Sequence, residues 1–132
     1  MFSFSQQSLD NLAECDPQLQ ELMNEVIKYF DCAIICGHRG QVEQHKAFIE
    51  GNSEVDWPNG KHNSIPSKAL DALPYYSDRI SRESAQNHYF FAGFVKAIAI
   101  KMGIKVRIGA DWNGDKNTLN QSLKDPCHIE VE

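Results

Sequence analysis

The sequence has no run of lysine or arginine, and acidic residues outnumber basic ones. It contains 18 Asp and Glu against 13 Lys and Arg, which gives a formal net charge of -5. Domains that bind nucleic acid normally carry a basic patch facing the phosphates, so we expect no nucleic-acid partner. A glycine-rich phosphate-binding loop is also missing, which argues against the common nucleotide-binding motifs.

Long apolar runs are missing as well. The start of the chain, MFSFSQQSLDNLAECDPQ, has neither the basic residues nor the apolar core of a secretory signal. The longest apolar region, YFFAGFVKAIAIKMG, is interrupted by Lys96 and Lys101 and is too short to cross a bilayer. We therefore expect a chain made in the cytoplasm, without membrane insertion, whose four cysteines are reduced.

The composition is that of an ordinary globular domain. Hydrophobic residues make up 42% and charged residues 23% of 132 residues, which is enough apolar material for one well-filled core. We expect a single domain over residues 1–132 that acts as a monomer.

The hydrophobic pattern predicts three helices and four short strands. The helices are expected at 16–30, begun by Asp16 as N-cap, at 41–50, stopped by Gly51, and at 81–102, ended by Gly103. The strands are expected at 32–36, 68–75, 105–112 and 127–131, with Pro74 closing the second. Helices and strands do not alternate regularly, so the predicted class is α+β with a small antiparallel sheet and flanking helices.

Three residues spread along the chain could form a metal site, and a fourth could serve as its general base. Asp71 stands in the apolar run ALDALP, where an unpaired buried charge would be costly. His62 lies in the polar loop before it, and His128 begins the last strand, three residues after Asp125. Two imidazoles and a carboxylate form one of the known ligand sets of catalytic zinc. Such a site needs a further carboxylate as general base, and Asp125 fits that requirement.

The same residues also allow structural interpretations. Asp71 could form an ion pair with Arg39 or Lys68. His62 could be a solvated loop residue, and His128 a hydrogen-bonded histidine of the core. Spacing alone does not decide between these alternatives and a metal site.

Four sequence blocks in a fixed order carry a resemblance to a known family. They are CGHRGQVEQ, KHNSIPSKALDALPY, GADWNGD and DPCHIEV. Together they resemble the zinc D-Ala-D-Ala carboxypeptidase-like peptidases, and most of all the small phage endolysins of that group, the L-alanyl-D-glutamate endopeptidases. The resemblance runs from about Ser8 to the C-terminus. It implies the hedgehog-like zinc peptidase fold, in which a small antiparallel sheet carries the ligands.

The resemblance also implies roles for individual residues. His62, Asp71 and His128 would bind Zn²⁺, and Asp125 would be the catalytic base. Arg39 would polarise the substrate carbonyl or steady the oxyanion, a task that suits the fixed donors of a guanidinium.

The chain departs from the family pattern in several places. Eight residues separate the first histidine from the aspartate, two more than is usual. Gly60 replaces a common serine. Gly40 stands where the family usually has Ser or Thr, and His38 where it has an apolar or aromatic residue. We expect the longer loop to bulge outward without moving either ligand.

Two further residues are candidates for the site. Trp112 is either a wall of the substrate cleft or an aromatic residue of the core. Glu130 lies on the same strand face as His128 and is expected to orient a ligand imidazole through a hydrogen bond.

The function implied by the resemblance is a zinc metallopeptidase that hydrolyses the stem peptide of bacterial peptidoglycan. It would act as a bacteriophage endolysin, reaching the cell wall through a holin pore during host lysis. Three alternatives stay open: a D-Ala-D-Ala carboxypeptidase or dipeptidase, a non-catalytic wall-binding module with structural zinc, and a metal-free domain.

Overall fold

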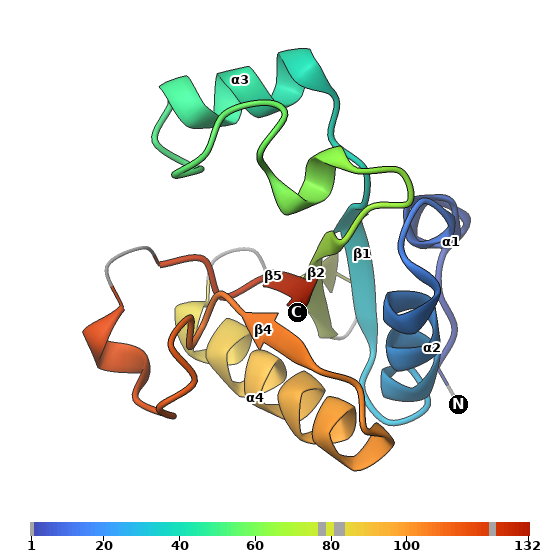
Figure 1. Cartoon of the computed structure of the whole chain (residues 1–132). Helices are drawn as coiled ribbons and strands as arrows, with labels where there is room; N and C mark the ends of the chain where they lie inside the picture. Colours follow the sequence, from blue (N-terminus) through green and yellow to red (C-terminus); the bar gives the residue numbers. More distant parts are fainter. Residues whose placement is uncertain (1, 77–78, 81–83, 122–123) are drawn as a thin grey trace.

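An antiparallel sheet forms the centre of the molecule (Figure 1). The computed structural model describes residues 2–76, 79–80, 84–121 and 124–132. The strand order is β1-β2-β5-β4, and β3 pairs with the far end of β2. The strands are β1 (Cys32–Cys36), β2 (Ala69–Tyr76), β3 (Arg79–Ile80), β4 (Val106–Ile108) and β5 (His128–Val131). All pairings between these strands are antiparallel, which confirms the predicted α+β class.

The described residues form four α-helices: α1 (Gln6–Ala13), α2 (Pro17–Val26), α3 (Gln41–Ile49) and α4 (Ala85–Met102). The expected end signals are present. The Asp16 carboxylate accepts a hydrogen bond from the Gln18 backbone N–H at the start of α2, and Gly103, at φ 74°, ends α4. Helix α1 was not predicted, because it is short and mostly polar. Two single helical turns, η1 (Lys61–Asn63) and η2 (Thr118–Asn120), lie in the long loops.

One face of the sheet is packed against the core, and the opposite face carries several polar residues. Successive residues of a strand point to opposite sides, so every second strand residue faces the same way. The core contains Leu70, Ala72, Val106, Ile108, Ile129 and Val131 from the strands, together with apolar residues of α1, α2 and α4. The residues between these strand positions project from the opposite face, on the side where α3 and its following loop lie apart from the main body (Figure 1).

Several predicted boundaries differ from the observed ones. Strand β2 continues to Tyr76, beyond the expected stop at Pro74, which pairs with Cys32 at the very end of β1. The next residue, Tyr75, donates a 2.9 Å hydrogen bond from its N–H to the Asp31 carbonyl. Only every second residue of an antiparallel strand donates to a given neighbour, so Pro74 needs no N–H toward the β1 segment. Helix α2 ends at Val26, and β4 ends at Ile108, where an isolated bridge to Asp111 turns the chain back. The expected helix start at residues 81–83 lies outside the described residues.

Gly109 lies where β4 passes very close to the segment that leads into β5. Its N–H donates a 2.8 Å hydrogen bond to the carbonyl of His128. A Cβ atom on Gly109 would overlap the carbonyl oxygen of Asp125 and crowd the Cβ of His128. The absence of a side chain here is therefore a condition for placing Asp125 beside β4.

We expect Gly109→Ala to destabilise the protein by about 1–3 kcal/mol, because the added methyl group must displace backbone atoms. The measurement is the free energy of unfolding in urea. Gly93→Ala is the matched control, because Gly93 is exposed on α4 and a Cβ atom there would have no neighbouring atom within 4 Å. That variant should gain about 0.5–1 kcal/mol from the better helix propensity of alanine. Equal effects of the two substitutions would contradict the close approach at Gly109.

Candidate active site

The register of the sheet places four polar side chains together. Asp71 of β2 is paired directly with His128 of β5, and Arg107 of β4 with Glu130 of β5. Their neighbours Leu70, Ile108 and Ile129 belong to the core. The four polar residues therefore share the opposite face of the sheet.

His62 reaches this face from outside the sheet. It lies on η1, and only 3% of the residue is exposed, so the alternative of a solvated loop histidine is wrong. Its Nδ1 lies 2.8 Å from the carbonyl oxygen of Gly37, and its own carbonyl accepts a 2.8 Å hydrogen bond from the Arg39 N–H. We assign the Nδ1 proton to the Gly37 contact, which leaves Nε2 as the free ring nitrogen, 3.4 Å from Asp71 Oδ1.

His128 is oriented by Glu130. Its Nε2 lies 2.8 Å from Glu130 Oε1, and the other carboxylate oxygen lies 3.0 Å from Nη2 of Arg107. Nδ1 of His128 is then the free nitrogen and lies 3.5 Å from Asp71 Oδ1. A carboxylate that fixes the ring of a ligand histidine in this way is common around protein metal sites.

The free atoms of His62, Asp71 and His128 fit a divalent metal ion. One donor atom from each residue lies within 4.8 Å of the others. Nε2 of His62 and Oδ1 of Asp71 are buried and have no hydrogen-bond partner. Tetrahedral ligands with bonds of 2.0–2.1 Å lie about 3.4 Å apart, close to the 3.4 and 3.5 Å observed here. A small cation between the three residues would satisfy both buried atoms.

Arg39 contributes a second compensating charge to Asp71. Its Nη2 lies 3.4 Å from Asp71 Oδ2, so the ion pair considered as an alternative from the sequence also exists. It occupies the other carboxylate oxygen and leaves Oδ1 facing the two histidines. The ion pair and the metal site are therefore compatible.

The protonation of the cluster follows from burial and from its ion pairs. Burial raises the pKa of Asp71, but contacts with His128 and His62 outweigh it and hold the pKa well below its usual range. Burial lowers the pKa of His62, but the Asp71 carboxylate and Cys36 raise it to about 10. Without a metal, protonated His62 supplies the positive charge next to Asp71. A metal ion that binds here has to displace this proton.

Asp125 lies beside the cluster as a further carboxylate. Its Oδ2 is 4.0 Å from His128 Nδ1, and its Oδ1 accepts a 3.3 Å hydrogen bond from the Cys127 thiol. Burial and the negative charge of Asp71 raise its pKa above the usual value. A carboxylate with a raised pKa is a better proton acceptor than an ordinary aspartate.

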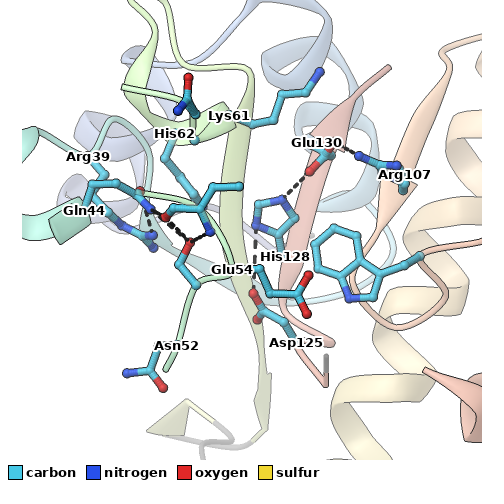
Figure 2. A pocket seen from close by; sticks show the side chains of 15 residues that line it. Arg39, Gln44, Asn52, Glu54, Lys61, His62, Arg107, Asp125, His128 and Glu130 are labelled. Atoms are coloured by element: carbon cyan, nitrogen blue, oxygen red, sulfur yellow. Dashed lines mark hydrogen bonds and ion pairs between the residues drawn. The ribbon is translucent and has the colours of Figure 1, made fainter. Parts of the chain in front are cut away.

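His62, His128 and Asp125 line a cavity of about 360 Å³ (Figure 2). Trp112 lines it, with its ring 5.1 Å from that of His128, so the tryptophan is a wall of the cleft and not an aromatic residue of the core. The lining includes Arg39, Gln44, Glu54, Lys61, His62, Arg107, Trp112, Asp125, His128 and Glu130.

Gln44 of α3 connects Arg39 to the loop that follows the helix. Its Oε1 accepts hydrogen bonds from Arg39 Nη1 at 3.2 Å and from Asn63 Nδ2 at 3.1 Å. Its Nε2 donates to Ser53 Oγ at 2.9 Å and to the Val55 carbonyl at 2.6 Å. The residue is buried, so this amide both orients the guanidinium and holds the loop against the cavity.

Two of the departures from the family pattern have local explanations. A Cβ atom on Gly60 would come too close to the side chains of Asn63 and Gln44, which leaves no room for a serine. The longer connection between His62 and Asp71 projects outward, with Ile65 84% exposed. Both ligand candidates nevertheless lie in the cluster.

Comparison with known proteins agrees with this geometry. The sequence profile of the family described as phage L-alanyl-D-glutamate peptidase matches residues 1–131. The chain belongs to this family. It is 27% identical over 135 residues to the L-alanyl-D-glutamate peptidase of Escherichia phage T5, with 98% of each chain covered.

The fold of this phage peptidase family member is also found in a solved structure. The crystal structure of the Serratia marcescens L-Ala D-Glu endopeptidase ChiX superposes with a TM-score of 0.78 at 20% sequence identity. The match covers 98% of this chain and 90% of the other. The resemblance stated from the sequence blocks is thereby confirmed for both family and fold.

Gln44 and Arg107 are among the cavity residues that the sequence did not identify as part of the site. Gln44 lies in a polar helix without a distinguishing pattern, although it belongs to the block CGHRGQVEQ. Arg107 alternates with the buried Val106 and Ile108, which marks it as pointing away from the core. Its pairing with Glu130 depends on strand register, which the sequence does not reveal.

We expect Gln44→Leu to lower the free energy of unfolding by about 1–3 kcal/mol, because buried partners on Arg39, Asn63 and the loop lose their hydrogen bonds. Amide hydrogen exchange at residues 53–55 should accelerate as the loop is released. Gln41→Leu on the exposed side of the same helix is the control and should stay within about 0.5 kcal/mol of the original protein. Unchanged exchange at 53–55 would show that Gln44 does not hold the loop.

Proposed function

We propose that this chain is a zinc-dependent L-alanyl-D-glutamate endopeptidase that hydrolyses the stem peptide of bacterial peptidoglycan as a phage endolysin. The observation that carries the proposal is the cluster of two free imidazole nitrogens and one free carboxylate oxygen, with Asp125 beside it at the cavity. The family match gives the bond class. The alternative of a D-Ala-D-Ala carboxypeptidase has no comparable support.

His62 through Nε2, Asp71 through Oδ1 and His128 through Nδ1 are the proposed ligands. Two imidazoles and one carboxylate suit zinc better than magnesium or calcium, which prefer oxygen ligands. When bound, zinc supplies Lewis acidity that polarises carbonyl groups and makes water more acidic at neutral pH. Glu130 holds His128 in the tautomer that presents Nδ1.

Asp125 and Arg39 carry the proton and the charge of the reaction. Asp125 takes a proton from the attacking water and passes it to the leaving amine of D-glutamate. Arg39, oriented by Gln44, stabilises the negative charge that develops on the carbonyl oxygen. A site with a purely structural metal would need neither group, which speaks against a non-catalytic wall-binding module.

The location and assembly of the enzyme follow from this proposal. We expect the chain to act as a single catalytic domain and as a monomer, and to reach the wall through a holin pore. Among the described residues, no helix has both the length and the apolar character needed to span a bilayer.

The bond that is cleaved can be identified directly. Purified sacculi are digested with the protein, and the released muropeptides are examined by mass spectrometry. The expected products carry new N-terminal D-glutamate. Loss of terminal D-alanine alone would overturn the endopeptidase assignment in favour of a carboxypeptidase.

We expect Asp125→Asn to bind one zinc per chain and to lose about 10²–10⁴-fold in hydrolysis rate, because the amide cannot accept the proton. Zinc content is measured by elemental analysis, and turnover is measured on a stem peptide. Asp10→Asn, on the exposed surface of α1, removes the same charge far from the cavity and should keep full activity. An active Asp125→Asn enzyme would remove Asp125 from the mechanism.

Chelation should destabilise the protein, since zinc binds only the folded state. At a free zinc concentration one hundred times the dissociation constant, the expected stabilisation is about 2.7 kcal/mol. The measurement is the melting temperature with chelator and after zinc is restored. His62→Ala should abolish the difference, whereas His45→Ala, an exposed residue of α3, should retain it. Identical melting temperatures in the original protein would support a metal-free domain.

A further inference from the structure

Three basic side chains line the cavity, and they differ in how far they are already engaged. Arg39 is largely buried and is held by Asp71 and Gln44. Nζ of Lys61 lies 3.4 Å from the carbonyl oxygen of Val131. The side chain of Arg107 is 47% exposed, whereas Arg39 and Lys61 are only partly exposed. Arg107 is therefore the basic residue of the cavity that is most accessible to a ligand.

Arg107 is held in place on one side only. Its Nη2 lies 3.0 Å from Glu130, whose side chain is 5% exposed, and its guanidinium carbon lies 5.7 Å from the centre of the Trp112 ring. A guanidinium has five N–H donors, and in the described part of the chain only Nη2 makes a hydrogen bond. Toward the described residues the remaining donors make no hydrogen bond, an arrangement that favours a planar carboxylate ligand.

The acidic side chains of the cavity favour direct contact between an acidic ligand and a cation. Glu54, Asp125 and Glu130 all line the same space. A carboxylate entering among them would be repelled unless a positive group met it directly. Arg107 is placed to do this at the wall formed with Trp112.

The proposed substrate brings a carboxylate to this place. D-Glutamate has two carboxyl groups, of which one continues the stem peptide and the other remains free. Its nitrogen belongs to the scissile bond, so the free carboxylate lies only a few bonds from the reacting atoms, on the leaving side.

The direction of the bound peptide follows from the positions of the groups. Arg39 and Gln44 lie at one end of the cavity and Arg107 at the other, with His128 and Asp125 between them (Figure 2). If Arg39 meets the carbonyl oxygen and Asp125 meets the leaving nitrogen, the residue after the scissile bond extends toward Arg107.

We propose that Arg107 is a specificity-determining residue, which binds the free carboxylate of D-glutamate on the leaving side of the scissile bond. This inference rests on the proposed function. It assigns the preference for an acidic residue after the bond to one side chain, whereas the metal cluster and Asp125 act on any peptide bond.

The test compares two synthetic stem peptides that differ in one group. In one the D-glutamate carboxylate is free, and in the other it is a primary amide. The original protein should cleave the acid with a kcat/KM about tenfold to a hundredfold above that of the amide, the range expected for a charge-assisted hydrogen bond. Arg107→Gln should bring this ratio close to one, and Arg107→Lys should restore part of it.

The ratio separates recognition from positioning. Loss of Arg107 also leaves Glu130 without its ion pair, which can slow turnover through His128, but that effect applies equally to both peptides and cancels. Lys61→Gln removes the same charge from the same cavity and should keep the ratio.

The outcomes distinguish the two levels of the proposal. Cleavage of neither peptide by the original protein would overturn the proposed function. A ratio near one in the original protein, a ratio retained in Arg107→Gln, or a ratio lost in Lys61→Gln would overturn the role of Arg107 while leaving the endopeptidase assignment intact.

Discussion

The carboxylate of Asp71 has to be compensated, because its side chain is only 14% exposed and its Oδ1 is buried, in the middle of the sheet on β2. An isolated buried charge would cost more than most single interactions return. Here one oxygen meets Arg39 and the other lies between the two histidines. These partners come from three separate parts of the chain, so the compensation of one charge also fixes the meeting point of the loop after β1, the turn η1 and strand β5.

One face of the sheet packs into the core and stabilises the fold, and the other face carries the residues of the candidate site. Alternate residues of β2, β4 and β5 fill the core, and the residues between them supply Asp71, Arg107, His128 and Glu130. A shift of register by one residue would exchange these two sets and bury the polar ones. The apolar core therefore selects the register that aligns the site. The site face in turn carries a continuous row from Arg107 through Glu130 to His128.

Much of this arrangement could be predicted from the sequence. The helices that begin at Asp16 and end at Gly103 carry strong end signals, and the strands are short apolar runs. The set of His62, Asp71, Asp125 and His128 came from a resemblance of ordered blocks, because spacing alone left ion pairs and core histidines open. The position of Arg107 depends on strand register, and that of Gln44 on a loop that closes over helix α3. The position of Trp112 in the cleft depends on the turn after β4. These are tertiary features without a local pattern.

The length of the exposed connection around Ile65 does not affect the positions of His62 and Asp71. His62 is fixed by Gly37 and by the backbone of Arg39, and Asp71 by the sheet, so neither depends on residues 64–66 for its position. Closing a longer flexible loop is inexpensive, at about 0.6 kcal/mol for each doubling of its length. Residues 64–66 are therefore a natural point for inserting a tag or fusing a wall-binding segment at the rim of the catalytic face.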